Sequence, residues 1–304
     1  MRLALDIGGT KLVAGRVDAQ LSVPHPMTVP TPTSDVWGAC DQLLRAVADG
    51  EDVTDVGIAC AGPVDLVGGA VSPINIPEWA AGFPLAANVR DIWPRARIEL
   101  AMDGAAAALG EHRLGAGRGT ENLLSLVVST GIGGGLVVGG RLVAGRTGNA
   151  GHVGHIAVSA GSEPCSCGGV GCLETVASGP SSVRWARAQG WTGTDGRTLA
   201  RAAQAGDPTA VAALHRAGTA LGEAFASVAA LLDLETVVVG GGFARAGPPL
   251  WDAIHSEVAR RGRLSFLSGL RVVPAELGPS GTLAGAALLT DGPHWSSADC
   301  SNLL

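Results

Sequence analysis

The sequence predicts an α/β protein with two lobes around a central cleft. Segments with a strand pattern alternate with segments of helical spacing, which is typical of α/β folds. Both halves begin with an apolar strand, a glycine turn and a second apolar strand, which indicates an approximate internal duplication. Glycines at 115, 117 and 119 separate the halves, and 304 residues fit two domains. Two lobes with mirrored glycine hairpins are expected to face each other across the cleft.

The first lobe is expected to span residues 1–116. Its strands are predicted at 2–7, 12–17, 53–59 and 97–101, and its helices at 35–49 and 104–114. Four prolines within residues 19–34 favour an extended connector or a sheet edge, and residues 73–84 have the composition of a loop. A C-terminal helix near 281–290 is expected to complete this lobe.

The second lobe is expected to span residues 117–280, with a loose tail at 291–304. Its strands are predicted at 123–129, 136–139, 237–239 and 270–274. Its helices are predicted at 174–188, 196–205, 207–232 and 248–262. A loop at 155–172, rich in cysteine and glycine, belongs to this lobe.

Composition excludes several classes of protein. Hydrophobic residues make up 46% of the chain and the mean hydropathy is positive, yet no apolar run reaches the ~18 residues of a membrane span. The formal net charge is −6 and no basic block occurs, so neither a nucleic-acid partner nor a membrane is expected. Asp6 comes too early for a signal peptide, and six cysteines in so long a chain do not form a secreted disulfide scaffold. A cytoplasmic protein is therefore expected.

Glycine turns after apolar strands have the composition of phosphate-binding loops. Glycines let backbone N–H groups approach an anion, and in the first turn a hydroxyl, a cation and a carboxylate that suits Mg²⁺ accompany them. Each turn alone is as typical of a plain hairpin, but two turns in matching places of the halves favour phosphate binding. The candidate ligands are Asp6, Gly8, Gly9, Thr10 and Lys11 in the first turn, Thr130, Gly131, Gly133 and Gly134 in the second, and Gly240, Gly241 and Gly242 in a third glycine run.

Two familiar nucleotide motifs do not fit this chain. A strand, and not a helix, follows the glycine turn at 129–135, which argues against a Rossmann dinucleotide site. No Walker GxxxxGK[ST] sequence occurs, which argues against a P-loop ATPase.

Four metal-ligating side chains cluster in the sequence, with the pattern H-x₉-C-x-C-x₄-C at His155, Cys165, Cys167 and Cys172. One imidazole and three thiolates suit a tetrahedral structural Zn²⁺ site, and the intervening glycines permit a tight loop. The alternative is a reduced surface loop with free thiols. Cys40 and Cys60 lie in apolar stretches and are expected in the core, and Cys300 lies in the tail.

The chain resembles the ROK family of repressors, open-reading-frame proteins and sugar kinases. The resemblance rests on six motifs in the family's order, which together cover almost the whole chain: DIGGTK at 6–11, DGAAAALGE at 103–111, STGIGGG at 129–135, GHVGH at 151–155, CSCGGVGCLE at 165–174 and VVVGGG at 237–242. The family implies an actin-like ATPase (ribonuclease H-like) fold, usually as a homodimer. It also implies ATP and Mg²⁺ in the cleft and phosphoryl transfer to a hexose hydroxyl, typically at C6.

The resemblance assigns roles to particular residues. Asp103, which alone would read as a helix N-cap, matches the family's catalytic base for the sugar C6 hydroxyl. Glu174 and His155 match residues that bind sugar hydroxyls, with His155 also holding zinc. Asn75 lies in a loop of the family's N-x-P-x-W type and is expected at the sugar, although a turn asparagine fits as well.

Two positions depart from the family's kinases. Met102 stands where they have an asparagine before the catalytic Asp, and His152 stands where they have the Glu of an ExGH motif. Met102 cannot reproduce the hydrogen bond of an asparagine to the sugar, so plain glucose is in doubt. The family's N-acetylmannosamine kinases can also carry His at the place of His152, but they keep the asparagine before the catalytic Asp. We therefore expect the substrate to be an amino sugar or another modified hexose of the glucose type. Kanosamine (3-amino-3-deoxyglucose) and N-acetylmannosamine are the candidates.

Two functional alternatives stay open at this point. If His152 is a neutral substitution, the chain is an ordinary glucokinase. A protein of another class, a non-catalytic sugar-sensing relative, is the second alternative. A sugar-responsive repressor needs a DNA-binding domain before the first phosphate turn, and that turn begins at residue 6.

Overall fold

The computed structural model describes residues 1–291, so Cys300 and most of the predicted tail at 291–304 lie outside the described residues. The chain forms two compact units. Unit 1 contains residues 1–118, residues 135–151 and the segment from Pro279 onward. Unit 2 contains residues 119–134 and 152–278. Among the described residues, no helix combines the length and the apolar character that a bilayer crossing requires.

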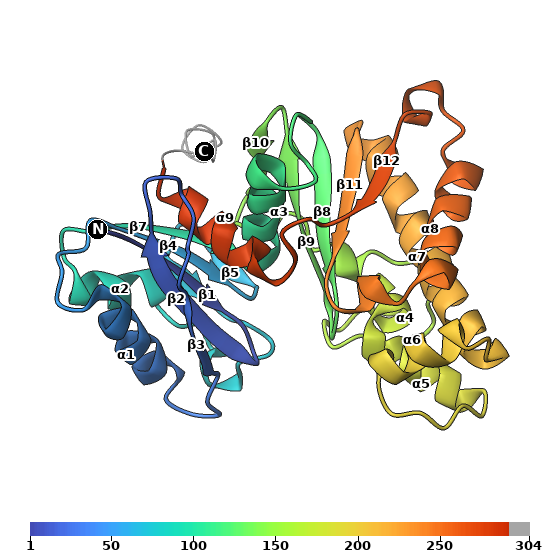
Figure 1. Ribbon diagram of the computed structural model, residues 1–304, viewed down its shortest axis with the longest axis horizontal. Helices are drawn as coiled ribbons and strands as arrows, with labels where there is room; N and C mark the ends of the chain where they lie inside the picture. Colours follow the sequence, from blue (N-terminus) through green and yellow to red (C-terminus); the bar gives the residue numbers. More distant parts are fainter. Residues whose placement is uncertain (292–304) are drawn as a thin grey trace. The chain divides into compact units, whose positions relative to one another are not determined.

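Unit 1 is built on a five-stranded sheet, which Figure 1 shows in blue to green. The order is β3 (Met27–Pro30), β2 (Lys11–Val17), β1 (Arg2–Ile7), β4 (Asp55–Cys60) and β7 (Arg97–Met102). Strand β1 pairs antiparallel with β2 and parallel with β4, which pairs parallel with β7. Ile7 lies opposite Cys60, and Cys60 opposite Met102, so three parallel strands end at one edge.

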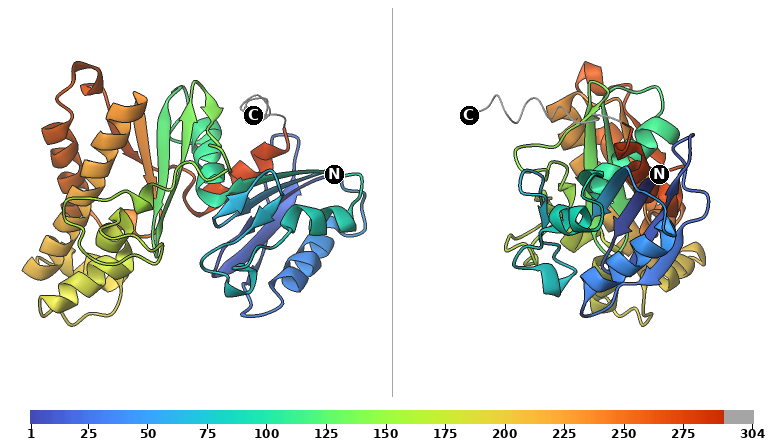
Figure 2. Two further views of the ribbon diagram at one scale, coloured as in Figure 1. Left: turned by 180° about the vertical axis from the view of Figure 1, so that it is seen from behind. Right: turned by 90° about the vertical axis from the view of Figure 1, so that its left-hand side faces the viewer.

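Helices cover both faces of this sheet. Figures 1 and 2 show α1 (Val36–Ala48) and α2 (Leu85–Ile92) on one face, and α9 (Gly281–Leu289) with α3 (Asp103–Leu114) on the other. Helix α9 packs on β1, β4 and α3. Two glycines make this close approach possible, because a Cβ at Gly57 would strike the carbonyl oxygen of Ala286, and one at Gly285 that of Ala106.

Several short elements of unit 1 have no periodic signal in the sequence. They are β5 (Val64–Asp65), β6 (Ala70–Val71), β10 (Arg141–Leu142) and the 3₁₀ helix Pro77–Trp79. Helix α2 was not expected either, because its eight residues are too few for a clear apolar stripe. The proline-rich segment supplies β3, which is an edge strand as expected.

The second sheet repeats the strand order of the first, which confirms the predicted duplication. Its order is β10, β9 (Ile132–Val138), β8 (Leu123–Val128), β11 (Thr236–Gly240) and β12 (Arg271–Pro274), and the division between the units passes through β9. Strand β11 pairs parallel with β8 and with β12. The α/β prediction is thereby confirmed in both sheets.

The helices of unit 2 are α4 (Leu173–Ala177), α5 (Gly179–Ala188), α6 (Gly196–Gln204), α7 (Pro208–Leu232) and α8 (Pro248–Arg261). The single helix predicted at 174–188 is wrong. Ser178 has an extended backbone between α4 and α5, and its side chain accepts a hydrogen bond from the Ser181 backbone N–H as the N-cap of α5. Pro180 in the first turn of α5 has no N–H to donate back to α4, so the helix restarts there.

Candidate functional site

The first glycine turn joins β1 to β2 and presents polar groups at its tip. The backbone N–H of Gly8 donates to the carbonyl of Lys11 at 3.1 Å, and the hydroxyl of Thr31 donates to the carbonyl of Gly8 at 2.6 Å. Thr10 and Lys11 are exposed at this tip. The predicted ligands of this turn therefore lie together, held in place by backbone hydrogen bonds.

Asp6 and Asp103 both stand at the edge where the parallel strands of unit 1 end. Burial raises the pKa of Asp103 to about 6, although the Gly104 backbone N–H, which donates to its Oδ1 at 2.6 Å, opposes the rise. Burial, and then the charge of Asp103, raise the pKa of Asp6 to about 7, and Lys11 partly offsets this. When two neighbouring carboxyl groups have different pKa values, one can accept a proton while the other binds a cation.

The residue before Asp103 does not line a polar site. The side chain of Met102 is 2% exposed and belongs to the core of unit 1. In this chain the position that carries asparagine in the family's kinases is thus part of the hydrophobic packing, and it presents no polar atom beside Asp103.

Asn75 lies directly against the first glycine turn. A Cβ at Gly9 would come within 2.7 Å of the Asn75 amide, so only glycine leaves room for this side chain. Two contacts fix the loop that carries Asn75. The Glu78 carboxylate accepts a hydrogen bond of 3.0 Å from the first backbone N–H of α1, that of Val36. The ring of Trp79 stacks on that of Phe83, with 4.4 Å between the ring centres. The predicted sugar residue Asn75 is therefore beside a predicted phosphate turn.

The second glycine turn is shorter than predicted. The turn comprises residues 129–131, with the Ser129 N–H donating to the Gly131 carbonyl at 2.9 Å, and β9 already begins at Ile132. Gly133 and Gly134 therefore lie within a strand and not in a turn. Sequence reasoning missed this because strand hydrogen bonding can continue through glycines that carry no β propensity of their own.

The third glycine run ends β11. Gly241 has φ +93°, and a Cβ there would strike the backbone of Val128, so both conformation and space require glycine. Gly242 leads into a 3₁₀ helix, Phe243–Arg245. This run lies beside the strand that leads into the second turn.

A cavity of about 1000 Å³ opens within unit 2 beside these two glycine segments. Ser129 and Thr130 line it, as do Gly242 and the first residues of α5. Four arginines also line it, Arg184, Arg187, Arg197 and Arg245, together with Asp195 and Phe243. From the sequence, the group Arg184, Arg187, Arg197 and Arg201 favours a solvated helix face over a partner site, so we did not predict these arginines as site residues. Glycine backbone, hydroxyl groups and cations in one cavity are suited to a phosphorylated ligand.

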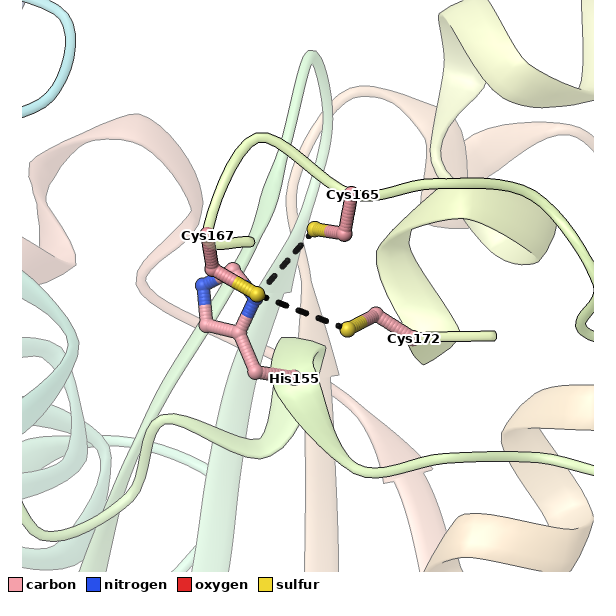
Figure 3. Close-up of side chains that lie close together, drawn as sticks. All are labelled: His155, Cys165, Cys167 and Cys172. Carbon is pink, nitrogen blue, oxygen red and sulfur yellow. Dashed lines mark hydrogen bonds between the residues drawn. The ribbon is translucent and has the colours of Figure 1, made fainter. Parts of the chain in front are cut away.

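His155, Cys165, Cys167 and Cys172 converge in unit 2, as Figure 3 shows. Their ligand atoms all lie within 4.8 Å of one another, and the five cysteines among the described residues are free thiols. Cys167 Sγ and Cys172 Sγ are 3.7 Å apart, and Cys165 Sγ is 3.6 Å from His155 Nδ1. Tetrahedral zinc bonds would give about 3.8 Å between two sulfurs and about 3.6 Å between sulfur and nitrogen. The donor set therefore fits a zinc ion.

His152 lies close to this cluster, and its ring centre is 5.8 Å from that of His155. Burial, and then His155, lower the pKa of His152, although Glu174 opposes the shift. Its Nε2 is buried and has no hydrogen-bond partner within residues 1–291. The ring is therefore neutral at pH 7, with one nitrogen available to a ligand.

Glu174 contacts the second glycine turn. Its Oε2 accepts a hydrogen bond of 2.7 Å from the backbone N–H of Ile132, the first residue of β9. The sequence assigned this carboxylate only to the sugar, and nothing in the residue pattern indicates its contact with the turn.

The chain is similar to known proteins over almost its whole length. The ROK family model matches residues 2–292. A kanosamine kinase from Amycolatopsis mediterranei is 34% identical over 302 residues, covering 94% of this chain and 95% of the relative. An N-acetylmannosamine kinase from Citrobacter koseri is 36% identical over 243 residues, covering 79% of this chain and 82% of the relative. The crystal structure of a ROK family glucokinase from Streptomyces griseus in complex with glucose and AMPPNP is 33% identical, with a TM-score of 0.82, and covers 95% of this chain and 99% of that one.

The partly buried carboxylates Asp6 and Asp103 predict a specific pH dependence of stability. Because the folded-state pKa values of Asp6 and Asp103 lie above the usual 3.8, the folded chain keeps protons that the unfolded chain releases, and stability is lost as pH rises from about 4 to 7. Asp6→Asn removes one of these titrating groups. We therefore expect its free energy of unfolding to exceed that of the parent by about 1–3 kcal/mol at pH 8, and by much less at pH 4. Urea unfolding at both pH values measures this gap, and a gap that does not widen with pH would contradict the assignment.

Proposed function

The chain belongs to the ROK family and is a hexose kinase, and from this premise we propose that it transfers phosphate from ATP to the C6 hydroxyl of an amino-substituted or otherwise modified glucose-type hexose. The reaction of such a sugar kinase requires ATP and Mg²⁺. Kanosamine and N-acetylmannosamine are the candidate acceptors. Relatives named for each of them are 34% and 36% identical to this chain.

The observation that carries this proposal is the unpartnered Nε2 of His152. A buried polar nitrogen without a hydrogen bond costs about 1–3 kcal/mol, which a ligand that pairs with it would recover. A neutral imidazole has one donor and one acceptor, whereas the glutamate of the ExGH motif only accepts. His152 can therefore donate to or accept from a sugar substituent, including an amino or N-acetyl group, at a place where a glutamate could only accept.

The identity of residue 102 supports the same proposal. A site for glucose that depends on an asparagine before the base lacks that hydrogen bond here, because the thioether of Met102 cannot replace the asparagine amide. Loss of a polar contact at a site built for it strongly lowers the rate on the sugar that needs it.

In this proposal Asp103 is the general base. A carboxyl group with a pKa of about 6 is ionised at pH 7 and still basic enough to accept the proton of the sugar hydroxyl as the phosphoryl group is transferred. Asp6 holds Mg²⁺ through water, and Thr10, Lys11 and Thr130 face the phosphates. Asn75, His152, His155 and Glu174 bind the sugar.

We assign zinc to the cluster of His155, Cys165, Cys167 and Cys172. Four protein ligands leave no open coordination position, so the ion would have a structural role and take no part in the chemistry. With Nδ1 turned toward the cysteines, His155 has its Nε2 for a sugar hydroxyl.

An ordinary glucokinase is the second candidate. The observation that favours it is the likeness to the Streptomyces griseus glucokinase in complex with glucose, which extends over 95% of this chain. A non-catalytic sugar sensor is less well supported, because Asp103 and the glycine turns are all present.

Steady-state kinetics on a sugar panel separates these candidates. We expect kcat/KM for kanosamine or N-acetylmannosamine to exceed that for glucose by about tenfold or more, since Met102 and His152 stand where a glucose site would have an asparagine and a glutamate. ADP release is measured with each sugar, and His152→Glu is the matched variant, which should move the preference toward glucose. A parent enzyme that prefers glucose would establish the ordinary glucokinase instead.

Replacing the base should remove turnover while leaving nucleotide binding. Asp103→Asn cannot accept the proton, and we expect kcat to fall about 10²–10⁴-fold. In the parent, kcat/KM should decline as pH drops below about 6, where Asp103 is protonated. Glu99→Gln on the same strand β7 is the control and should retain parental kcat. An Asp103→Asn protein that turns over like the parent would exclude Asp103 as the base.

Metal analysis tests the zinc assignment. Cys167 is exposed, so Cys167→Ser removes one ligand with little effect on packing. We expect the parent to carry one zinc ion for each chain and Cys167→Ser to lose it, because a neutral hydroxyl is a poor zinc ligand. Cys40→Ala, on α1 and outside the cluster, should keep the metal. A variant that retains full zinc without the Cys167 thiol would refute this ligand set.

A further inference from the structure

We propose that Glu174 and Gly154 together hold the second glycine turn in position, so that the loop carrying the four metal-ligating side chains sets the affinity for nucleotide. This makes Glu174 a positioning residue for the phosphate donor in addition to its assigned contact with the sugar. The inference rests on the proposed function, because it assumes that residues 129–131 bind the phosphates of ATP.

Both contacts are made at one residue, Ile132, where the turn ends and β9 begins. Glu174 Oε2 accepts the Ile132 N–H at 2.7 Å. A Cβ at Gly131 would come within 2.6 Å of the same oxygen, which shows how tightly the carboxylate lies against the turn. Gly154 lies against the carbonyl of Ile132, and a Cβ there would strike its oxygen. The N–H of Ile132 is thus held by a hydrogen bond, and its carbonyl is closely packed against Gly154.

Each of these two residues is next to a ligand of the metal cluster. Gly154 immediately precedes His155, and Glu174 is two residues after Cys172. The two segments are joined directly, since the Leu173 N–H donates to the Ile156 carbonyl at 2.8 Å and Ala157 pairs with Cys172. The positions of Glu174 and Gly154 are therefore fixed by the same short segments that bring His155 and Cys172 together.

The turn itself transmits a displacement of Ile132 to the cavity. Only Thr130 and Gly131 separate Ile132 from Ser129, whose carbonyl accepts the Gly179 N–H at 2.9 Å. Thr130 and Gly179 both line the cavity with the four arginines. With Ser129 anchored at the start of α5, a shift of Ile132 must be absorbed by Thr130 and Gly131, the residues assigned to the phosphate.

Direct binding of AMPPNP, without sugar, tests this inference. In Glu174→Ala the Ile132 N–H loses a charged acceptor, and we expect the dissociation constant for AMPPNP to rise roughly ten- to hundredfold. In Glu174→Gln the amide oxygen still accepts from Ile132, so the constant should stay within about threefold of the parent. Gly269→Ala, which has open space for a Cβ, is the control and should bind like the parent.

Gly154→Ala provides a second test that leaves the carboxylate and all four metal ligands in place. We expect it to weaken AMPPNP binding by about tenfold while the zinc content stays near the parental value, and the clash with the Ile132 carbonyl should lower the thermal midpoint by a few degrees. If this variant does not fold, the comparison of Glu174→Ala with Glu174→Gln decides. Removal of zinc from the parent by chelation should weaken AMPPNP binding in the same direction.

The outcomes separate the inference from the function on which it rests. If the parent binds AMPPNP and Glu174→Ala binds it equally well, the positioning role is overturned while the kinase proposal stands. If Glu174→Gln is as weak as Glu174→Ala, the charge and not the hydrogen bond to Ile132 matters, which also overturns it. A parent that does not bind AMPPNP would overturn the proposed function itself.

Discussion

The structure depends on the parallel pairing of β1, β4 and β7, which ends three strands at one edge of a sheet. This pairing brings Asp6 and Asp103, far apart in the sequence, into the same electrostatic environment. Neither carboxyl group is fully compensated there, so ionisation of the pair opposes folding. The hydrophobic packing of α9 and α3 against the sheet offsets that cost. The two carboxyl groups therefore stay close together in the folded protein.

Much of the fold could be predicted from the sequence, because its long elements carry strong periodic signals. Strand 2–7 and helix 207–232 were predicted within a residue of the observed β1 and α7, and the duplicated strand order followed from the paired apolar strands. The cysteine and histidine spacing also predicted a cluster that the structure brings together. These features are determined by local pattern or by a short loop, so the remainder of the chain does not alter them.

Features that depend on a few side-chain contacts could not be predicted. The break at Ser178 is decided by one capping hydroxyl, and the strand through Gly133 and Gly134 by its hydrogen-bonded neighbours. The contact of Glu174 with Ile132 joins positions 42 residues apart, which no local pattern can indicate. The burial of Met102 likewise depends on tertiary packing: the sequence showed that an asparagine is lacking, and only the structure showed that the position is in the core.

Helix α9 has a consequence for the order in which the protein matures during synthesis. It packs on β1 and β4 of unit 1, yet it leaves the ribosome only after all of unit 2 has been translated. The part of the unit 1 sheet that α9 covers, including Gly57 on β4, therefore stays uncovered in the nascent chain, although α3 on the same face is already translated. A chain stalled before residue 281 would expose that apolar surface to chaperones or to other nascent chains. Docking of α9 covers the surface and so removes a site at which the chain could aggregate.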